Sequence, residues 1–379
     1  MKVLFVDQFG KTTGRDTLAL AELINENNNI DMTVFLSDNT EIPKDRNYTV
    51  NIVKGFHDAY VGNFLNKTIN YLKALKQLKE FIDDNKFDIV HLQWFSLPWI
   101  EWMYVGIIAK KSKIVITVHD VIPFDNRPFE MKSLNKIYSK ADALLIHTET
   151  SKKLFQKKYS AKTPISCITQ GFCLKSDYKR IDSETAKQHF NIPADSIVFL
   201  YYGTIRPSKG IEILIKAIHK AQAKDKKVFL LAAGALHRVN EEELKELIKE
   251  ELSEDSSFIS IGFVPQEEEQ WYFSAADVLC LPYLEVTQSG VAQLGLMYDL
   301  PIIATDVGEM KDVCRDGLNG IIVNSGNIEQ LSDAIIQLAE DCKFRLQATN
   351  KSKELGEKEF SLKIKADKVK KVYEDISFK

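Results

Sequence analysis

The sequence predicts two doubly wound α/β domains, and three observations lead to this fold class. The chain has 379 residues, of which 45% are hydrophobic, enough to build two packed cores. Short runs rich in Val, Ile and Leu recur and are apolar on both faces, as in parallel strands that helices cover. Segments between them, such as 16–26 and 210–224, carry apolar residues at helical spacing. Strands that alternate with helices are typical of doubly wound sheets.

The expected strands fall into two series, which predicts where the domains divide. The runs stop between Gly171 and Asp195, where the sequence is polar. We expect one domain over 1–173, a second over 174–360, and a last amphipathic helix over 361–379 that crosses back onto the first domain. The expected strands are 2–7, 88–92, 113–120 and 142–148 in the first series, and 196–204, 227–234, 258–264, 277–283 and 301–306 in the second.

Charge and cysteine usage exclude several classes of protein. The formal net charge is only −3, which gives no reason to expect a nucleic-acid partner. Residues 1–174 carry 23 Lys and Arg against 19 Asp and Glu, and the remainder carries 27 against 34, which indicates different partners for the halves. The five cysteines form no CxxC pair, which favours a reducing cytosol and argues against a zinc site. No apolar run reaches the roughly 18 residues that span a membrane, so we expect a cytoplasmic protein, attached at most to the inner face of the cell membrane.

A basic turn follows the first strand of the second series. In YYGTIRPSKG (201–210) an expected strand ends and a helix begins, with Arg206 and Lys209 on the turn between them. Open α/β sheets bind ligands at such strand ends. Arg binds a phosphate through two N–H groups, and Lys acts as a point charge. A single basic turn is more often a solvated surface loop, so this motif needs support from others.

A second strand–loop–helix unit spans 279–310. Its loop, from Glu285 to Gly290, places Thr-Gln-Ser-Gly directly before an expected helix. The first N–H groups of a helix have no intrahelical acceptor and favour anions, and small residues let a phosphate or sugar approach them. An ordinary unit of an α/β domain accounts for this segment equally well when it is taken alone.

Together, these motifs resemble glycosyltransferase family 4, the retaining GT-B enzymes, over nearly the whole chain. The resemblance implies two Rossmann-like doubly wound domains that face a central cleft. It also implies transfer of a sugar from a nucleotide-diphosphate sugar to a glycan or lipid-linked glycan, with no metal and no other cofactor. The matching residues are Gly203, Pro207, Lys209 and Gly210; Gly262, Val264 and Pro265; Ala275 to Val278; Pro301 to Gly308 with Asp312 and Val313; and Asp316 to Gly320.

The resemblance assigns roles to particular residues. Arg206 and Lys209 hold the donor diphosphate and stabilise its charge as it departs, while the diphosphate helps to take the acceptor proton. His119, at the end of an expected strand, positions the sugar and the acceptor without forming a covalent bond, and Glu285 contacts the donor sugar. The loop 7–17 lines the cleft, although its glycines also serve as simple turn formers. The residues expected to bind the donor are Gly10, Gly14, Gly203, Thr287, Gln288, Ser289, Gly290, Val291 and Gln293.

The chain departs from the family pattern at one carboxylate. Many members carry two glutamates eight residues apart, and the second binds the nucleotide ribose. Here Gln293 lies eight residues after Glu285, whereas ungapped alignment backward from Pro301 places Val286 and Leu294 at the two positions. Gln293 can hydrogen-bond to ribose hydroxyls and Leu294 cannot. This departure motivates two alternatives: a catalytically silent GT-B subunit that binds a sugar nucleotide or a partner transferase, and a sugar-nucleotide epimerase.

Two segments point to the acceptor and to a membrane surface. Residues 91–105 contain three tryptophans, and the expected helix over 66–81 carries Lys67, Lys73, Lys76 and Lys79. Aromatic side chains suit sugar stacking or a membrane interface, and a basic helix suits anionic lipid head groups. Core packing with a solvated lysine face explains the same pattern. Peripheral contact with an anionic membrane is therefore an expectation with an ordinary alternative.

Overall fold

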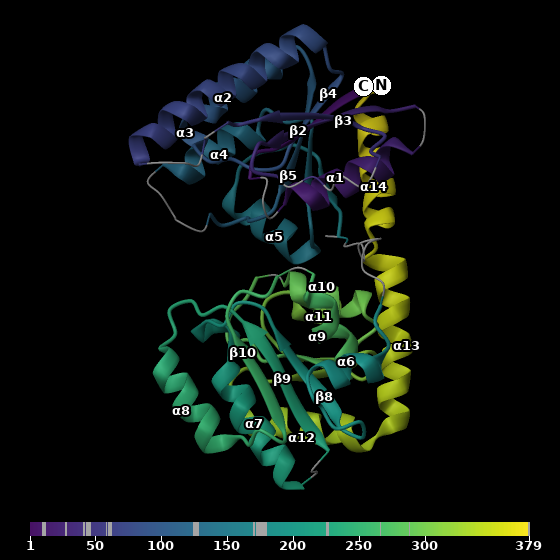
Figure 1. Ribbon diagram of the computed structural model, residues 1–379. Coiled ribbons are helices and arrows are strands. Elements are labelled where there is room, and N and C mark those ends of the chain that lie inside the picture. Colours follow the sequence, from purple (N-terminus) through teal and green to yellow (C-terminus); the bar gives the residue numbers. More distant parts are fainter. Residues whose placement is uncertain are drawn as a thin grey trace. The chain divides into compact units, whose positions relative to one another are not determined.

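The protein, described from a computed structural model, consists of two compact units (Figure 1). Unit 1 comprises Met1–Gly171 and Leu362–Lys379, and unit 2 comprises Phe172–Ser361. Each unit is built on a parallel sheet with helices on both faces. The structure describes residues 1–9, 13–26, 29–40, 42, 47–57, 59, 63–123, 129–169, 171, 180–224, 227–265, 267–287 and 289–377.

Unit 1 contains a seven-stranded parallel sheet in the order β3-β2-β1-β4-β5-β6-β7. The strand order changes direction between β1 and β4. This switch point is where doubly wound sheets bind ligands, at the carboxyl ends of the strands. The strands are β1 (Lys2–Asp7), β2 (Asp31–Ser37), β3 (Asn51–Gly55), β4 (Ile89–Leu92), β5 (Lys113–Val118), β6 (Ala143–Ile146) and β7 (Ile165–Cys167).

Two hydrophobic cores cover the faces of this sheet. One core packs α2, α3, α4 and α5 on one face, and the other packs α1 and α14 on the opposite face (Figure 1). Helix α14, the C-terminal helix, contacts α1, and the Ser377 hydroxyl lies 2.9 Å from the Met1 sulfur, so the chain ends lie together. The helices are α1 (Gly14–Asn25), α2 (Phe64–Asn85), α3 (Pro98–Ile108), α4 (Glu130–Tyr138), α5 (Glu149–Lys158) and α14 (Leu362–Ser377).

Unit 2 repeats this plan with six parallel strands in the order β10-β9-β8-β11-β12-β13. Its switch point lies between β8 and β11. Strand residues are apolar on both faces because both faces are covered: Phe199 and Leu200 are each fully buried, in different cores. The strands are β8 (Ile197–Tyr202), β9 (Val228–Gly234), β10 (Ser257–Ile261), β11 (Val278–Leu281), β12 (Ile302–Thr305) and β13 (Gly320–Val323).

The helices of unit 2 divide between the two faces of the sheet. One group packs on one face: α7 (Ile211–Lys224), α8 (Glu241–Glu251) and α12 (Ile328–Glu340). The other group packs opposite: α6 (Ser183–His189), α9 (Glu269–Ala275), α10 (Gly290–Met297), α11 (Met310–Val313) and α13 (Cys342–Glu359). A single 3-10 turn, η1 (Pro207–Lys209), joins β8 to α7.

The predicted fold class is confirmed, and each of the nine expected strands is present. Four strands were not predicted: β2, β3, β7 and β13. Three of these lie at sheet edges and are only partly buried, so they lack the long apolar run that marks the central strands in the sequence. Within the described ranges, no helix combines the length and the apolar character that crossing a membrane requires.

Candidate active site

The basic turn at 206–210 is held against the loop that follows β11. Gly210 has a φ of +67°, and a Cβ atom there would lie 2.0 Å from the carbonyl oxygen of Pro282. Only glycine allows both the conformation and this approach. The backbone N–H of Glu285 donates to the carbonyl oxygen of Ser208 at 3.3 Å. The structure therefore brings Glu285 beside the predicted cations.

Lys209 and Arg206, the two cations of this turn, are both partly buried. The ammonium nitrogen of Lys209 lies 3.4 Å from the centroid of the Tyr283 ring. Burial, aided by the positive charge of Arg206, lowers the pKa of Lys209 to about 7. The Arg206 Nε atom is buried without a hydrogen-bond partner, and neither cation has an ion-pair partner among the described residues. Two adjacent cations without a carboxylate partner favour an anionic ligand.

Three loops meet at the carboxyl ends of β8, β11 and β12. A Cβ atom on Gly203, after β8, would lie 3.3 Å from a methyl carbon of Val291 on α10. Gly308, after β12, has a φ of +54°, and its Cβ would lie 2.0 and 2.8 Å from the carbonyl oxygens of Val286 and Thr287. The predicted donor-binding residues Gly203 and Thr287, on loops, and Val291, in the first turn of α10, thus converge at one edge of the sheet.

Ser289 caps α10 and fixes the start of that helix. Its hydroxyl oxygen accepts the N–H of Ala292 at 3.3 Å and lies 3.1 Å from the Tyr283 hydroxyl. The N–H groups of Gly290 and Val291 therefore lie in the first helical turn, where donors are free for a sugar or phosphate oxygen. Glu285 and Thr287 are exposed, whereas Gln288 lies outside the described residues.

Gln293 and Leu294, the two candidates for the missing second glutamate, differ in their surroundings. Gln293 is only 6% exposed, and its Oε1 atom has no hydrogen-bond partner within the described part of the chain. Leu294 packs against the unit 2 core. A buried amide oxygen without a donor costs free energy. Of the two residues, Gln293 is therefore the one with an acceptor atom that a ligand hydroxyl can satisfy.

In unit 1, the loop after β1 is anchored by Asp7. Its carboxylate accepts the hydroxyl of Thr17 at 2.6 Å, which ties the loop to α1. Gly14 begins α1, and a Cβ atom there would lie 2.6 Å from the Thr40 methyl carbon. Gly14 therefore allows a close approach between helix and loop. Gly10, also predicted to bind the donor, lies outside the described residues.

Gln8, the next residue of this loop, is held by a buried network. The Tyr71 hydroxyl lies 2.8 Å from Gln8 Oε1 and 2.5 Å from Glu101 Oε1. Burial raises the pKa of Glu101 to about 7, so its carboxyl holds a proton more readily than an exposed one. A protonated Glu101 donates to Tyr71, whose own proton is then free to reach Gln8. The Gln8 amide in turn donates to the Ser96 hydroxyl at 3.2 Å.

His119 follows β5 directly, and its ring contacts protein groups on three sides. Trp94 stacks on its face, with ring centroids 3.9 Å apart and planes 8° apart. Its Nε2 lies 2.9 Å from Gln93 Oε1, and its Nδ1 lies 3.2 Å from His147 Nε2. Burial lowers the pKa of His119 well below its usual value. The ring is therefore neutral at physiological pH and held in one orientation.

A cavity of about 340 Å³ opens beside His119 within unit 1. Its walls carry the aromatic rings of Phe9, Trp94 and Phe95 together with the carboxyl-bearing residues Asp120 and Glu130; among the described residues, neither lysine nor arginine lines it. The Trp94 Nε1 atom is buried and has no hydrogen-bond partner among the residues that the structure describes. Aromatic faces with nearby hydrogen-bonding groups suit a hydroxylated ring.

Several site residues were not predicted from the sequence: Gln93, His147 and Tyr283. Gln93 directly follows β4, His147 directly follows β6, and Tyr283 lies two residues after β11. The carboxyl ends of neighbouring parallel strands meet at one sheet edge. The signal that points to such residues is therefore a polar or aromatic side chain immediately after each strand.

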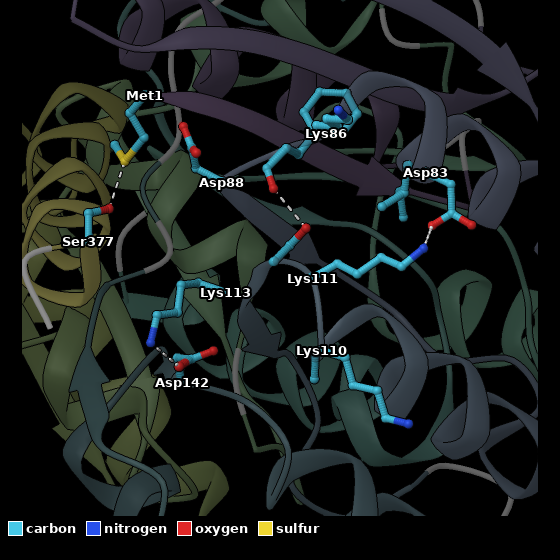
Figure 2. A pocket seen from close by; sticks show the side chains of 13 residues that line it. Met1, Asp83, Lys86, Asp88, Lys110, Lys111, Lys113, Asp142 and Ser377 are labelled. Atoms are coloured by element: carbon cyan, nitrogen blue, oxygen red, sulfur yellow. Dashed lines mark hydrogen bonds and ion pairs between the residues drawn. The ribbon is translucent and has the colours of Figure 1, made fainter.

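A second cavity in unit 1, of about 940 Å³, lies at the amino ends of β1, β4 and β5, the edge opposite His119 (Figure 2). Figure 2 shows Lys111 directed at Asp83 and Lys113 directed at Asp142. The ammonium nitrogens lie 2.7 and 3.1 Å from the respective carboxylate oxygens. These cations are already paired, unlike Arg206 and Lys209. Within the described chain, no group of three or more His, Cys, Asp or Glu side chains is arranged to hold a metal ion.

Comparison with known proteins gives consistent matches over both units. The family model "Glycosyl transferases group 1" matches residues 182–355, and "Glycosyl transferase 4-like" matches residues 17–149. The processive diacylglycerol alpha-glucosyltransferase of Acholeplasma laidlawii is 25% identical, with 60% of this chain and 69% of that protein aligned. The D-inositol 3-phosphate glycosyltransferase of Kribbella flavida is 20% identical over 77% of this chain and 72% of that protein.

Solved structures match the fold along the whole chain. HepE of Anabaena, determined in complex with UDP, superposes with a TM-score of 0.75 and 16% sequence identity, covering 99% of this chain and all of that one. Matches at this level of identity establish the architecture. One family model matches most of the first domain and the other matches most of the second domain, where the sequence motifs lie. The chain is therefore a GT-B glycosyltransferase of the family 4 type.

Proposed function

We propose that this glycosyltransferase is a retaining enzyme that moves a sugar from a nucleotide-diphosphate donor to a glycan or lipid-linked glycan. Unit 2 would bind the donor and unit 1 the acceptor. The observation that carries the proposal is the pair Arg206 and Lys209, adjacent cations at a strand end that have no carboxylate partner among the described residues. A diphosphate supplies the anionic charge that this pair lacks. The solved complex of HepE with UDP supports a nucleotide donor of this kind.

The donor loop complements the cations. The first N–H groups of α10, at Gly290 and Val291, offer donors to sugar or phosphate oxygens, and Glu285 lies beside the basic turn through its bond to Ser208. The unpaired Oε1 atom of Gln293 would accept a hydroxyl of the ribose. Gln293 thus takes over the hydrogen bond that the family's second glutamate makes.

The proposed reaction needs no side-chain nucleophile. The acceptor hydroxyl attacks the anomeric carbon on the face from which the diphosphate leaves, a new glycosidic C–O bond forms, and the C–O bond to the diphosphate breaks. The departing diphosphate takes the acceptor proton, while Arg206 and Lys209 stabilise its developing charge. His119 positions the sugar and the acceptor and remains neutral throughout.

The cavity beside His119 favours a neutral, hydroxylated acceptor. Asp120 and Glu130 accept hydrogen bonds from hydroxyl groups and repel phosphate, and Phe9, Trp94 and Phe95 give the cavity an aromatic lining. This lining differs from what a phosphorylated acceptor requires. We therefore expect a sugar ring without a phosphate as the acceptor end.

We also propose peripheral contact with an anionic membrane through α2 and α3. On helix α2, Leu65 is 65% exposed and Ile69 is 43% exposed. On helix α3, Trp99 is 53% exposed and Met103 is 46% exposed. These helices contact each other, and α2 adds the exposed cation Lys67. Exposed apolar side chains on two contacting helices, with a lysine on one of them, suit an anionic bilayer surface. The lipid acceptor of the Acholeplasma laidlawii relative, a diacylglycerol, is consistent with such a location.

The decisive experiment measures nucleotide diphosphate release by the purified protein across UDP-, GDP- and ADP-sugars, with a panel of neutral sugar acceptors. Acceptor-dependent release with retained anomeric configuration supports the proposal. Donor binding without release under any pairing would identify a catalytically silent subunit. Conversion of the donor in the absence of acceptor would identify an epimerase.

A further inference from the structure

A chain of buried polar groups runs along the carboxyl edge of the unit 1 sheet behind His119. The Tyr373 hydroxyl, on α14, lies 2.6 Å from His91 Nδ1, and His91 Nε2 lies 2.8 Å from the Thr117 hydroxyl. Gln93 Nε2 lies 3.1 Å from that hydroxyl, and Gln93 Oε1 lies 2.9 Å from His119 Nε2. Within the described residues these contacts connect the C-terminal helix to the cavity beside His119.

The series of polar contacts continues beyond His119 to Ile168, the residue that follows β7. His119 Nδ1 lies 3.2 Å from His147 Nε2, and His147 Nδ1 lies 3.1 Å from the carbonyl oxygen of Ile168. Parallel strand register explains the placement, because Val118 on β5 pairs with Ile146 on β6, and the residues that follow them are His119 and His147. His91, Gln93, Thr117 and His147 are each at least nine-tenths buried.

The number of imidazole protons limits how this series of polar contacts can be hydrogen-bonded. The contacts from Ile168 to His147, from His147 to His119 and from His119 to Gln93 Oε1 each require one proton. Two neutral imidazoles carry only two protons in total. The three contacts therefore demand either an extra proton shared by the histidine pair or a rotated Gln93 amide that presents its nitrogen to His119. Rotation by half a turn exchanges the amide oxygen and nitrogen without moving any other atom.

Burial and nearby charge favour the uncharged arrangement. Burial, together with the positive charge of Lys365 on α14, lowers the pKa of both His91 and His147 to about 3. The same causes, with the neighbouring His147, lower the pKa of His119. An additional proton on the histidine pair would be a buried positive charge facing a lysine, which is costly.

With the amide rotated, every bond in the chain has one donor and one acceptor. Tyr373 donates to His91 Nδ1, His91 Nε2–H donates to Thr117, and Thr117 donates to the Gln93 oxygen. The Gln93 nitrogen then donates to His119 Nε2, His119 Nδ1–H donates to His147 Nε2, and His147 Nδ1–H donates to the carbonyl oxygen of Ile168. We propose that this neutral, directional relay exists, and that His147 is the positioning residue that holds His119 in its Nδ1–H tautomer.

The consequence for catalysis rests on the proposed function. Both ring nitrogens of His119 are committed to protein groups, so the ring neither gives nor takes a proton during transfer. The Gln93 amide has a second N–H that the relay does not use, and Gln93 lines the cavity. Gln93 is therefore the relay's hydrogen-bond donor to a sugar oxygen, and it was not among the residues predicted for the site.

The test of the relay is the NMR spectrum of the imidazole nitrogens in the full-length protein labelled with ¹⁵N-histidine, assigned with single histidine variants. We expect three neutral buried rings, with the proton on Nε2 in His91 and on Nδ1 in His119 and His147. An imidazolium signal from the His119–His147 pair, or an Nε2–H tautomer of His119, would overturn the relay. This spectrum requires no activity, so it is decided even if the protein transfers no sugar.

Two variants separate a positioning role from a structural one. His147→Leu removes the acceptor of His119 Nδ1–H, so His119 should change to the Nε2–H tautomer, and kcat/KM should fall roughly tenfold to a hundredfold, the effect of about one hydrogen bond. His147→Gln keeps an acceptor near the same place and should preserve the tautomer and most activity. His57→Gln, at an exposed histidine of unit 1, is the matched control. An unchanged His119 tautomer in folded His147→Leu would refute the positioning role.

Discussion

The ammonium nitrogen of Lys209 lies 3.4 Å from the centre of the Tyr283 ring, although these residues belong to loops that follow different strands. The ring face provides a weak negative potential, and no carboxylate among the described residues pairs with this lysine. Burial and the nearby charge of Arg206 lower the pKa of Lys209 to about 7. The charge is thus held in place and available to a diphosphate.

Removal of this charge should stop sugar transfer without disturbing the fold. Lys209→Ala should reduce kcat by about two to three orders of magnitude, as loss of one preorganised charge-stabilising group does in other enzymes. The thermal unfolding midpoint should stay within a few degrees of wild type. Lys216→Ala, at an exposed lysine on α7, is the matched control and should keep full activity. Normal turnover by Lys209→Ala would refute the donor assignment.

Donor affinity should depend on pH through the same lysine. Because the pKa of Lys209 in the free protein is about 7, the ammonium form predominates below pH 7 and is lost above it. The dissociation constant for UDP, measured by calorimetry, should therefore rise with pH between 7 and 9, by at most about tenfold per unit. Lys209→Arg remains charged and should show a flat profile over the same range.

The turn that carries Lys209 should tolerate no side chain at Gly210. A Cβ atom there meets the Pro282 carbonyl oxygen at 2.0 Å, and φ is +67°. Gly210→Ala should therefore lower the free energy of unfolding by about 1–3 kcal/mol and reduce donor affinity. Gly106→Ala on α3, where the added carbon meets nothing within 4 Å, should be neutral or stabilising by up to about 1 kcal/mol. Urea denaturation of both variants tests this contrast.

Glu101 should make the stability of unit 1 depend on pH. Burial raises its pKa from 4.5 to about 7, so the folded state keeps a proton that the unfolded state releases between these values. The protonated Glu101 carboxyl contributes its full stabilisation below pH 4.5. This contribution is lost as the pH rises through 7, which lowers the free energy of unfolding by up to about 3 kcal/mol. Glu101→Gln donates to Tyr71 at every pH. The stability of this variant relative to wild type should increase from pH 5 to pH 8 in urea titrations.

Membrane contact should depend on the exposed apolar side chains of α2 and α3. Trp99→Ser, alone and with Leu65→Ser, should weaken binding to vesicles that contain phosphatidylglycerol, since each change removes exposed apolar surface from the interface. The matched control is Phe263→Ser, because Phe263 is 84% exposed on unit 2. Equal binding by all variants in sedimentation assays, or no binding by wild type, would contradict the proposal.

Much of this protein is readable from its sequence. Runs that are apolar on both faces identify buried parallel strands, and Gly203, Lys209 and Gly210 in one short turn predict an anion site at a strand end. These features are local, because an apolar run and a turn motif are each contained within a few consecutive residues. The edge strands β3, β7 and β13 are only partly buried and lack a long apolar run, so they are not predicted in this way.

Tertiary structure alone decided which side chains meet. His91, His119 and His147 are separated by 28 residues each, and Tyr373 follows far along the chain, yet strand register and the return of α14 place them in one relay. The choice between Gln293 and Leu294 likewise depends on their surroundings: among the described residues the buried Gln293 has an unpaired amide oxygen, whereas Leu294 packs against the unit 2 core. Sequence spacing determines strands, helices and turns, because these are local. The chemistry at the sheet edge depends on contacts between distant segments, which only the packed structure brings together.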